Sequence, residues 1–309
     1  MKQFNIKLLG LVLLLITGAS CSSDDNAPAL SSPQMTEVEI GYGNNGQGII
    51  GRDFHLNAEV LAGDAIDLVR VNIDQKAEEN YSQEWSFEIT WDEFMGLKNA
   101  TVHKHFDIPE DAPEGSYSFT ITVTDNNGTQ LQESFDFTII DPVNLPVDPY
   151  LYIWMVTTDQ GDFHYVNESL ENPEGVEFSN GEILKSDVTI NDVKGDGKLY
   201  LVLIKKEANH LPETIEAIDF SKVIVYDVFE HVDQAEVDSF SNIIYPSEPN
   251  PRPVPEFTIG TTTDNNTPAN AVNGEKSWEN GAYYFGLIYS NSTYNISVHH
   301  YMEITLNNF

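Results

Sequence analysis

The chain has 309 residues, with 15 Lys or Arg against 49 Asp or Glu, which gives a formal net charge of −34. A chain this acidic repels nucleic acid and anionic lipid head groups, so we exclude nucleic-acid binding. The charge indicates either a strongly hydrated surface or loop carboxylates that attract calcium or another cation.

The N-terminus has the pattern of a cleaved signal peptide over residues 1–20. Lys2 and Lys7 precede an apolar run over 8–16, and three small residues then lead to Cys21. The run is too short to span a bilayer of about 30 Å, so it is not an anchor. A cysteine directly after small residues resembles the lipobox of bacterial lipoproteins, in which that cysteine is acylated, as with palmitate, and becomes the mature N-terminus. The alternative is an ordinary secretory signal with a chance cysteine.

Cys21 is the only cysteine, so its lipidation leaves no thiol for disulfides, zinc-thiolate sites or nucleophilic catalysis. We expect acyl chains there to anchor the protein in the outer membrane through a flexible tether over 21–33. Residues 22–25, Ser-Ser-Asp-Asp, resemble the acidic export signal of Bacteroidota lipoproteins, which predicts a position facing the cell exterior. Removing residues 1–20 takes away two lysines and no acid, so the formal charge becomes −36.

Residues 34–140 alternate apolar and polar side chains, which is typical of half-buried β-strands. Seven such runs, separated by Gly, Pro, Asn and Asp turns, cover 37–42, 53–60, 66–74, 84–91, 101–108, 116–124 and 131–140. This spacing predicts an immunoglobulin-like β-sandwich. Tyr117 lies at the start of the sixth run, where such sandwiches often carry a tyrosine corner.

A segment with three prolines and no periodicity predicts a linker over 141–149. The β pattern then resumes, and we expect a second β-sandwich domain over 150–309. Its end repeats the first domain, because the sequence around Tyr117 is echoed around Tyr283, and each tyrosine begins an alternating run followed by a turn and a last strand. The predicted fold class is all-β, with two consecutive immunoglobulin-like β-sandwich domains after a lipoprotein signal peptide and tether.

The middle of the second domain differs from the first. Its pattern predicts short helices around 212–218 and 232–243, and an exposed polyproline-like segment over 246–255. The segment 191–197 has the Asp and Gly density of a calcium loop but lacks the ligand spacing of an EF-hand. We interpret it as a tight turn before a strand over 198–205, with calcium as the alternative.

One constellation in the first domain suggests a metal site. His103 and His105 point to the outer face of their strand, about 7 Å apart at their Cα atoms, and His55 lies on the outer face of another strand. In an immunoglobulin-like order these two strands are neighbours, so the three imidazoles could bind zinc or copper. The alternative is a polar sheet face on which histidine is tolerated. His299 and His300 point to opposite faces of the last strand and cannot share one site.

The first domain resembles a Bacteroidota lipoprotein domain, domain of unknown function 4625. The resemblance covers about 34–140, and the residues that carry it are His55-Leu56, the 85–91 strand, 102–109, Gly115-Ser116-Tyr117 and 124–128. It implies an immunoglobulin-like fold and a lipoprotein, without an established activity. Members tend to carry further histidines, where this chain has 72–76 and Ser118 instead, so a family metal site would have fewer ligands here.

No serine nucleophile motif, phosphate loop or dinucleotide fingerprint occurs in the sequence. The favoured hypothesis is therefore a non-enzymatic, surface-exposed lipoprotein that acts as a binding, adhesion or scaffold module for a glycan or protein partner. The alternative function is a metal-binding lipoprotein that uses His55, His103 and His105. Hydrolase activity of the second domain stays open, because catalytic carboxylates cannot be picked out among so many acids.

Overall fold

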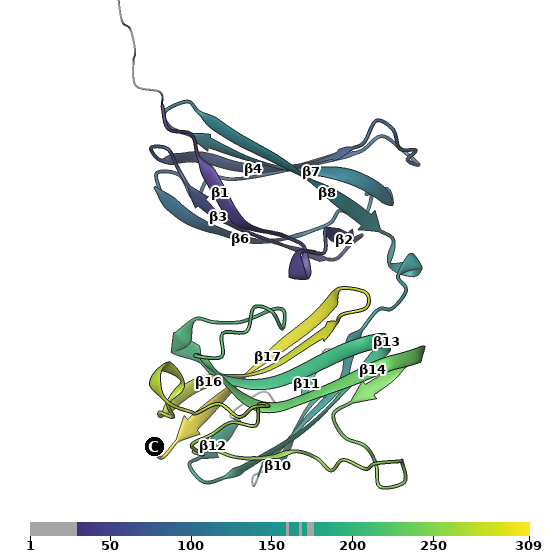
Figure 1. Ribbon diagram of the computed structural model, residues 1–309, viewed down its shortest axis with the longest axis vertical. Coiled ribbons are helices and arrows are strands. Elements are labelled where there is room, and N and C mark those ends of the chain that lie inside the picture. Colours follow the sequence, from purple (N-terminus) through teal and green to yellow (C-terminus); the bar gives the residue numbers. More distant parts are fainter. Residues whose placement is uncertain (1–29, 159–160, 167–168, 172–175) are drawn as a thin grey trace, which may run out of the picture.

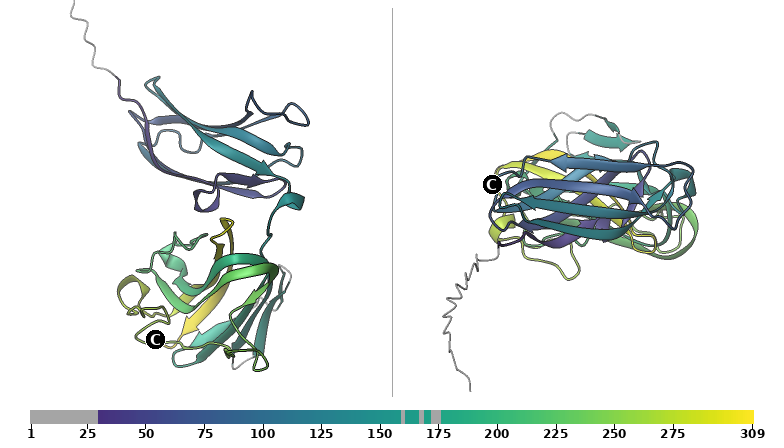
Figure 2. Two further views of the ribbon diagram at one scale, coloured as in Figure 1. Left: turned by 45° about the vertical axis from the view of Figure 1, so that its right-hand side comes forward. Right: turned by 90° about the horizontal axis from the view of Figure 1, so that it is seen from above.

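The computed structural model describes residues 30–158, 161–166, 169–171 and 176–309. They form two β units stacked on each other and joined at one side (Figures 1 and 2), called here the first unit, 34–140, and the second unit, 150–309. Strands and short 3-10 helices account for the regular structure of these ranges, which confirms the all-β fold. No helix within them has the length and apolar character needed to cross a membrane. The predicted signal peptide, Cys21 and export signal lie outside the described residues.

The first unit is a sandwich of a three-stranded sheet, β1-β3-β6, and a five-stranded sheet, β2-β8-β7-β4-β5. Its elements are β1 (Gln34–Ile40), η1 (Tyr42–Asn44), β2 (Gln47–Ile49), β3 (Asp53–Leu61), β4 (Ile66–Gln75), β5 (Ser86–Trp91), β6 (Asn99–Asp107), β7 (Gly115–Asp125) and β8 (Gln130–Ile140). All seven predicted strands are confirmed, and β2, a short strand parallel to β8, is an addition.

The core of the first unit consists of the apolar residues of the alternating runs. Phe54 on β3 lies fully buried at its centre and packs against aromatic rings from both sheets. Its ring centroid is 5.1 Å from that of Phe106, 5.5 Å from Phe119 and 5.2 Å from Phe137. Because side chains alternate along a strand, burying Phe54 places His55 on the opposite, outer face of the β1-β3-β6 sheet.

The second unit is built on one strongly bent sheet ordered β11-β10-β9-β13-β16-β17-β12, with β14 and β15 also paired to β13. Its strands are β9 (Tyr150–Thr158), β10 (Gly161–Val166), β11 (Ser169–Glu171), β12 (Glu177–Ser179), β13 (Ile183–Lys205), β14 (Val223–Ser241), β15 (Glu256–Thr258), β16 (Gly281–Asn291) and β17 (Ile296–Asn307). Three 3-10 helices complete the elements, η2 (Pro142–Asn144) before the unit and η3 (Lys206–Ala208) and η4 (Gly274–Lys276) within it.

Strand β13 joins the two parts of this bent sheet. Its first part pairs with β9 and its last part with β16, and its pairing with β14 shifts register between Ile190 and Gly197. Asp192 and Gly195 have positive φ angles of 61° and 74° in that stretch, which bends the strand. The predicted tight turn over 191–197 was wrong, because these residues form the bend inside one long strand.

The end of β13 is buried on both faces, as its continuous apolar run requires. Leu201 and its alternate neighbours face the main core, whereas Tyr200, Val202 and Ile204 face a smaller cluster on the other side. Ile218 covers that smaller cluster. It belongs to the segment 209–222 between η3 and β14, called here the 209–222 loop, which therefore lies on the outside of the sheet.

Both predicted helices of the second unit were wrong. Residues 212–218 form turns and bends in the 209–222 loop, and residues 232–241 continue β14. In β14 the sequence pattern suggested a short helix, but backbone pairing with β13 keeps the chain extended. The segment 246–255 is mostly exposed, as predicted, and has no helix or strand apart from a bridge between Arg252 and Ile244. It is not polyproline-like throughout, because the Glu248 backbone N–H bonds the Tyr245 carbonyl in a turn and Asn250 has a φ of 57°.

The predicted tyrosine corner is present, and its echo in the second unit has the same geometry. The Tyr117 hydroxyl donates to the carbonyl of Pro113 at 2.6 Å, and the Tyr283 hydroxyl donates to the carbonyl of Glu279 at 3.3 Å, each four residues upstream. Strands β7 and β16 both have 11 residues and begin with a glycine of positive φ, 153° and 148°. The two units therefore share this corner in detail.

Candidate metal centre

The pairing of β3 with β6 brings the three predicted histidines together. In the antiparallel register His55 lies directly opposite His105, and Asn57 lies opposite His103. Since Phe54 and Phe106 face the core, the three imidazoles project from the outer face of the β1-β3-β6 sheet. Their ring centroids lie 5.1 to 5.3 Å apart in every pair.

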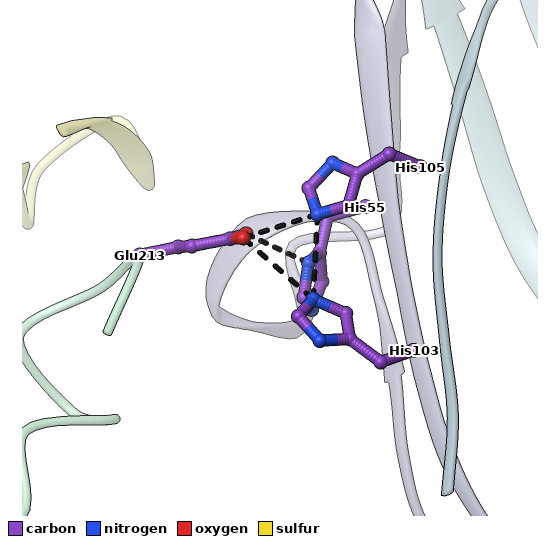
Figure 3. Close-up of side chains that lie close together, drawn as sticks. All are labelled: His55, His103, His105 and Glu213. Atoms are coloured by element: carbon purple, nitrogen blue, oxygen red, sulfur yellow. Dashed lines mark hydrogen bonds and ion pairs between the residues drawn. The ribbon is translucent and has the colours of Figure 1, made fainter. Parts of the chain in front are cut away.

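A fourth side chain, Glu213, reaches the histidines from the second unit (Figure 3). Its Oε1 lies 3.0 Å from His105 Nε2 and 3.6 Å from His103 Nε2, and its Oε2 lies 2.9 Å from His55 Nδ1. One potential ligand atom from each of these four residues can be chosen so that all lie within 4.8 Å of one another. We call His55, His103, His105 and Glu213 the histidine–glutamate cluster.

The 209–222 loop is fixed on the second unit around Glu213. The preceding residue, Pro212, accepts a hydrogen bond through its carbonyl from the Tyr301 hydroxyl on β17. The following residue, Thr214, is buried, and Ile218 inserts into the smaller apolar cluster. Farther along, the backbone N–H of Asp219 donates to His210 Nε2 at 3.1 Å. Glu213 is thus placed by packing on both sides.

The spacing of several ligand atoms is close to that around a tetrahedral ion. Ligand atoms about 2.0–2.1 Å from such an ion lie roughly 3.4 Å from one another. The two Nε2 atoms of His103 and His105 are 3.3 Å apart, and Glu213 Oε1 lies 3.6 and 3.0 Å from them. His55 Nδ1 faces the other carboxylate oxygen, Oε2, at 2.9 Å, and the four ligand atoms together lie within 4.8 Å of one another, so a tetrahedral ion would draw the most distant of them closer. His55 Nδ1 and Glu213 Oε2 are buried and form an ion pair at 2.9 Å, but they are not aligned for a hydrogen bond. A cation between them would satisfy both atoms.

Carboxylates behind the cluster orient two of the imidazoles. Asp53 Oδ2 lies 2.7 Å from His105 Nδ1, which leaves Nε2 facing the centre of the cluster, and it also accepts a hydrogen bond from the Tyr42 hydroxyl at 3.0 Å. Glu39 Oε2 lies 3.6 Å from His55 Nε2, which leaves Nδ1 facing Glu213. Such carboxylate–histidine pairs are typical of the surroundings of metal-bound imidazoles.

The cluster has a strong internal electrostatic coupling. Burial alone would lower the pKa of His55, but Glu213 and Glu39 offset it and raise this pKa to about 9. Burial would raise the pKa of Glu213, whereas His105 and His55 hold it well below its usual value. Contact with Glu213 also raises the pKa of His105, despite burial, while burial lowers that of His103. The carboxylate thus strongly favours a positive charge at this point.

A cavity of about 590 Å³ adjoins the cluster and is lined by all four of its residues, together with Asn57 and His210. The His103 side chain is 49% exposed and that of His105 35%, whereas His55 and Glu213 are 8% and 15% exposed. An ion therefore has a path from solvent to the buried side of the cluster.

Sequence reasoning placed the histidines correctly on one sheet face but missed two features. His55 lies on that outer face as expected, yet it is buried, because the Tyr42 ring stacks on it at 5.3 Å and Glu213 of the second unit contacts it. Glu213 was not recognised at all, since it is one of 49 acids and its loop was expected to be helical. His299 does not join the cluster but lies near it, with its ring centroid 5.8 Å from that of Tyr42.

The segment considered for calcium uses its carboxylates in backbone contacts. Asp192 accepts a hydrogen bond from the backbone N–H of Asp148, and Asp196 accepts one from that of Asp233. These contacts account for the position of both side chains at the bend of β13.

Two solved structures from Porphyromonas gingivalis resemble the chain at low sequence identity. Dimeric latent PorU matches with a TM-score of 0.32 and 9% identity, covering 92% of this chain, which spans only 21% of the PorU chain. A protein of unknown function from strain W83 matches with a TM-score of 0.21 and 10% identity, covering 89% of this chain and 98% of that one. No curated protein matches the sequence. Residues 19–140 match the family model described as a domain of unknown function, DUF4625, which confirms the resemblance predicted for the first unit.

Proposed function

We propose that this protein is a surface lipoprotein that binds a transition-metal ion, zinc or copper, in the histidine–glutamate cluster. The observation that supports this most is the convergence of three imidazoles and one carboxylate, whose ligand atoms lie within 4.8 Å of one another. Imidazole nitrogen is a good ligand for zinc and copper, whereas calcium takes oxygen ligands. We favour zinc because it has no d-electron preference against a tetrahedral arrangement.

The proposal also gives the cellular location of the metal site. Cys21, acylated after removal of the signal peptide, would hold the protein on the outer membrane, facing the cell exterior. In that position the cluster would meet extracellular metal ions, and the acidic surface would raise their local concentration.

Four protein ligands complete a tetrahedral coordination sphere, which is typical of structural rather than catalytic zinc sites. The geometry therefore favours a non-enzymatic role, in which the metal stabilises or positions the protein that binds it.

Calorimetric titration of the chain that starts at residue 21, with Cys21→Ser to remove the thiol, tests the proposal. We expect one zinc ion per chain, accompanied by release of the proton that His55 carries below a pKa of about 9. His103→Ala should weaken binding by at least about tenfold. His210→Gln removes an imidazole that lines the same cavity but keeps an acceptor for Asp219, so its affinity should match that of the unsubstituted chain. Absence of heat with both zinc and copper in the unsubstituted chain overturns the proposal.

A further inference from the structure

The ligands of the histidine–glutamate cluster are divided between the two units. Three imidazoles belong to β3 and β6 of the first unit, and Glu213 belongs to the 209–222 loop of the second. A metal ion held by all four residues would cross-link the two units, although the chain itself passes between them only through the linker.

The linker and the 209–222 loop lie on different sides of the junction. Figure 1 and the left view of Figure 2 show the linker at the right and the 209–222 loop, in green, at the left. At the linker side Arg52 of the first unit binds Asp148 with two hydrogen bonds of 2.6 Å. This arrangement has the form of a hinge at Asp148 and a latch at Glu213.

Packing between the latch and the hinge is open, and its hydrogen bonds are made by polar side chains and backbone. Asn45 donates a hydrogen bond to the carbonyl of Asn295 at 2.8 Å, and the rings of Tyr42 and His299 make a tilted contact. Cavities of about 590 and 260 Å³ are lined by residues of both units. Interfaces of this kind between domains normally allow relative motion, unless a specific contact holds them together.

We propose that metal occupancy of the cluster locks the two units in the closed arrangement, with Glu213 as the latch. This inference rests on the proposed function, because it needs the metal to bind. In the closed arrangement, the one seen in the structure, the metal has four ligands. In an open arrangement, with Glu213 moved away from the histidines, it has three. By linkage, the factor by which the fourth ligand tightens metal binding is also the factor by which the metal favours closure. We expect that factor to be at least about ten.

A distance measurement between the units tests the latch. Spin labels on Thr90→Cys in β5 and Glu236→Cys in β14, both exposed positions, report the separation of the units in the full chain carrying Cys21→Ser. We expect zinc to narrow the distribution of distances between the two labels. In Glu213→Gln, saturating zinc should still occupy the three histidines but leave the distribution broad.

Glu216→Gln is the matched control, because it removes an exposed carboxylate three residues further along the same loop. It should respond to zinc as the parent does. If calorimetry shows zinc bound while the distance distribution stays the same with and without zinc, the latch is wrong and the metal site stands. The latch is also wrong if zinc narrows the distance distribution of Glu213→Gln as fully as that of the parent. If zinc and copper do not bind at all, the proposed function itself fails.

Discussion

At the scale of single residues, Asp53 fixes the ring orientation of His105. Its carboxylate contacts His105 Nδ1 and also accepts the Tyr42 hydroxyl, so it directs Nε2 toward Glu213. Asp53→Asn should lower zinc affinity by about 10–100-fold, the usual effect of removing an outer carboxylate partner of a metal-bound histidine. Calorimetric titration of the full chain measures this effect.

Asp107→Asn provides the matched control for Asp53→Asn. Asp107 pairs with Asp53 across β3 and β6 and is exposed, so its loss changes the net charge equally at the same end of the sheet. Equal affinities of the two variants would mean that Asp53 acts only through charge, contrary to the role in ring orientation.

His300 should make the second unit sensitive to acid. Burial, with a smaller effect of His299, lowers its pKa to about 4 in the folded protein, against about 6.5 when unfolded. The unfolded state therefore binds the proton first as pH falls, and stability present above about pH 6.5 is lost toward about pH 4, by at most about 1.4 kcal/mol per pH unit. His300→Gln should flatten this part of the dependence.

Urea unfolding of the parent and His300→Gln at several pH values, with a chelator present, measures the difference. Subtracting one curve of unfolding free energy against pH from the other removes the contribution of the other titrating groups. Parallel curves between about pH 6.5 and 4 would show that His300 is not responsible.

The residues of the cluster show where prediction from sequence succeeds and fails. Strand alternation and the expected order of strands were enough to place His55 beside His103 and His105. The position of Glu213 depends on Ile218 and Tyr301 fixing a loop from another unit, about 100 residues away in sequence. No local pattern marks such a residue, because its environment is created only by tertiary packing.

At the scale of elements, the two tyrosine corners allow a comparison within one chain. Tyr117 donates over 2.6 Å from a fully buried position, and burial raises its pKa to about 12. Tyr117→Phe leaves the Pro113 carbonyl unsatisfied and should destabilise the first unit by about 1–3 kcal/mol. Tyr283→Phe should cost less, because the corresponding bond is 3.3 Å long.

Urea unfolding, monitored by the fluorescence of the two units, measures the free energy of unfolding of both corner variants. A larger loss in Tyr283→Phe than in Tyr117→Phe would contradict the ranking by hydrogen-bond length. The Glu279 backbone N–H also donates to the Tyr283 hydroxyl at 3.1 Å, and both bonds of Tyr283 are longer than the 2.6 Å bond of Tyr117.

The elements themselves were predictable to different degrees. In the first unit a two-residue period and frequent turns define each strand, and seven were located from sequence. In the second unit β13 is continuous through its bend, and β14 is extended only because it pairs along β13. Long-range pairing of this kind overrides the local spacing of apolar residues, and this is why two helices were wrongly expected.

At the scale of the whole molecule, the two units have separate cores. One cluster is built from residues of the first unit alone, and two others from residues of the second. Because the cores are separate and the junction contains cavities, we expect differential scanning calorimetry without metal to show two unfolding transitions. A single cooperative transition in the presence of a chelator would contradict this expectation.

Zinc should change this behaviour, because it binds only folded arrangements that present the cluster. At a free concentration of about 100 times its dissociation constant, a ligand adds about 2.7 kcal/mol to stability. Because three of the four ligands lie on β3 and β6, the first unit should gain most of this added stability. The latch should also bring the unfolding temperature of the first unit closer to that of the second unit. At the same zinc concentration a tenfold loss of affinity reduces the gain to about 1.4 kcal/mol, so His103→Ala and Glu213→Gln should both show a smaller shift, and in Glu213→Gln the two transitions should not converge. An equal zinc-induced shift in His103→Ala would place the bound metal elsewhere and separate the stabilisation from the cluster.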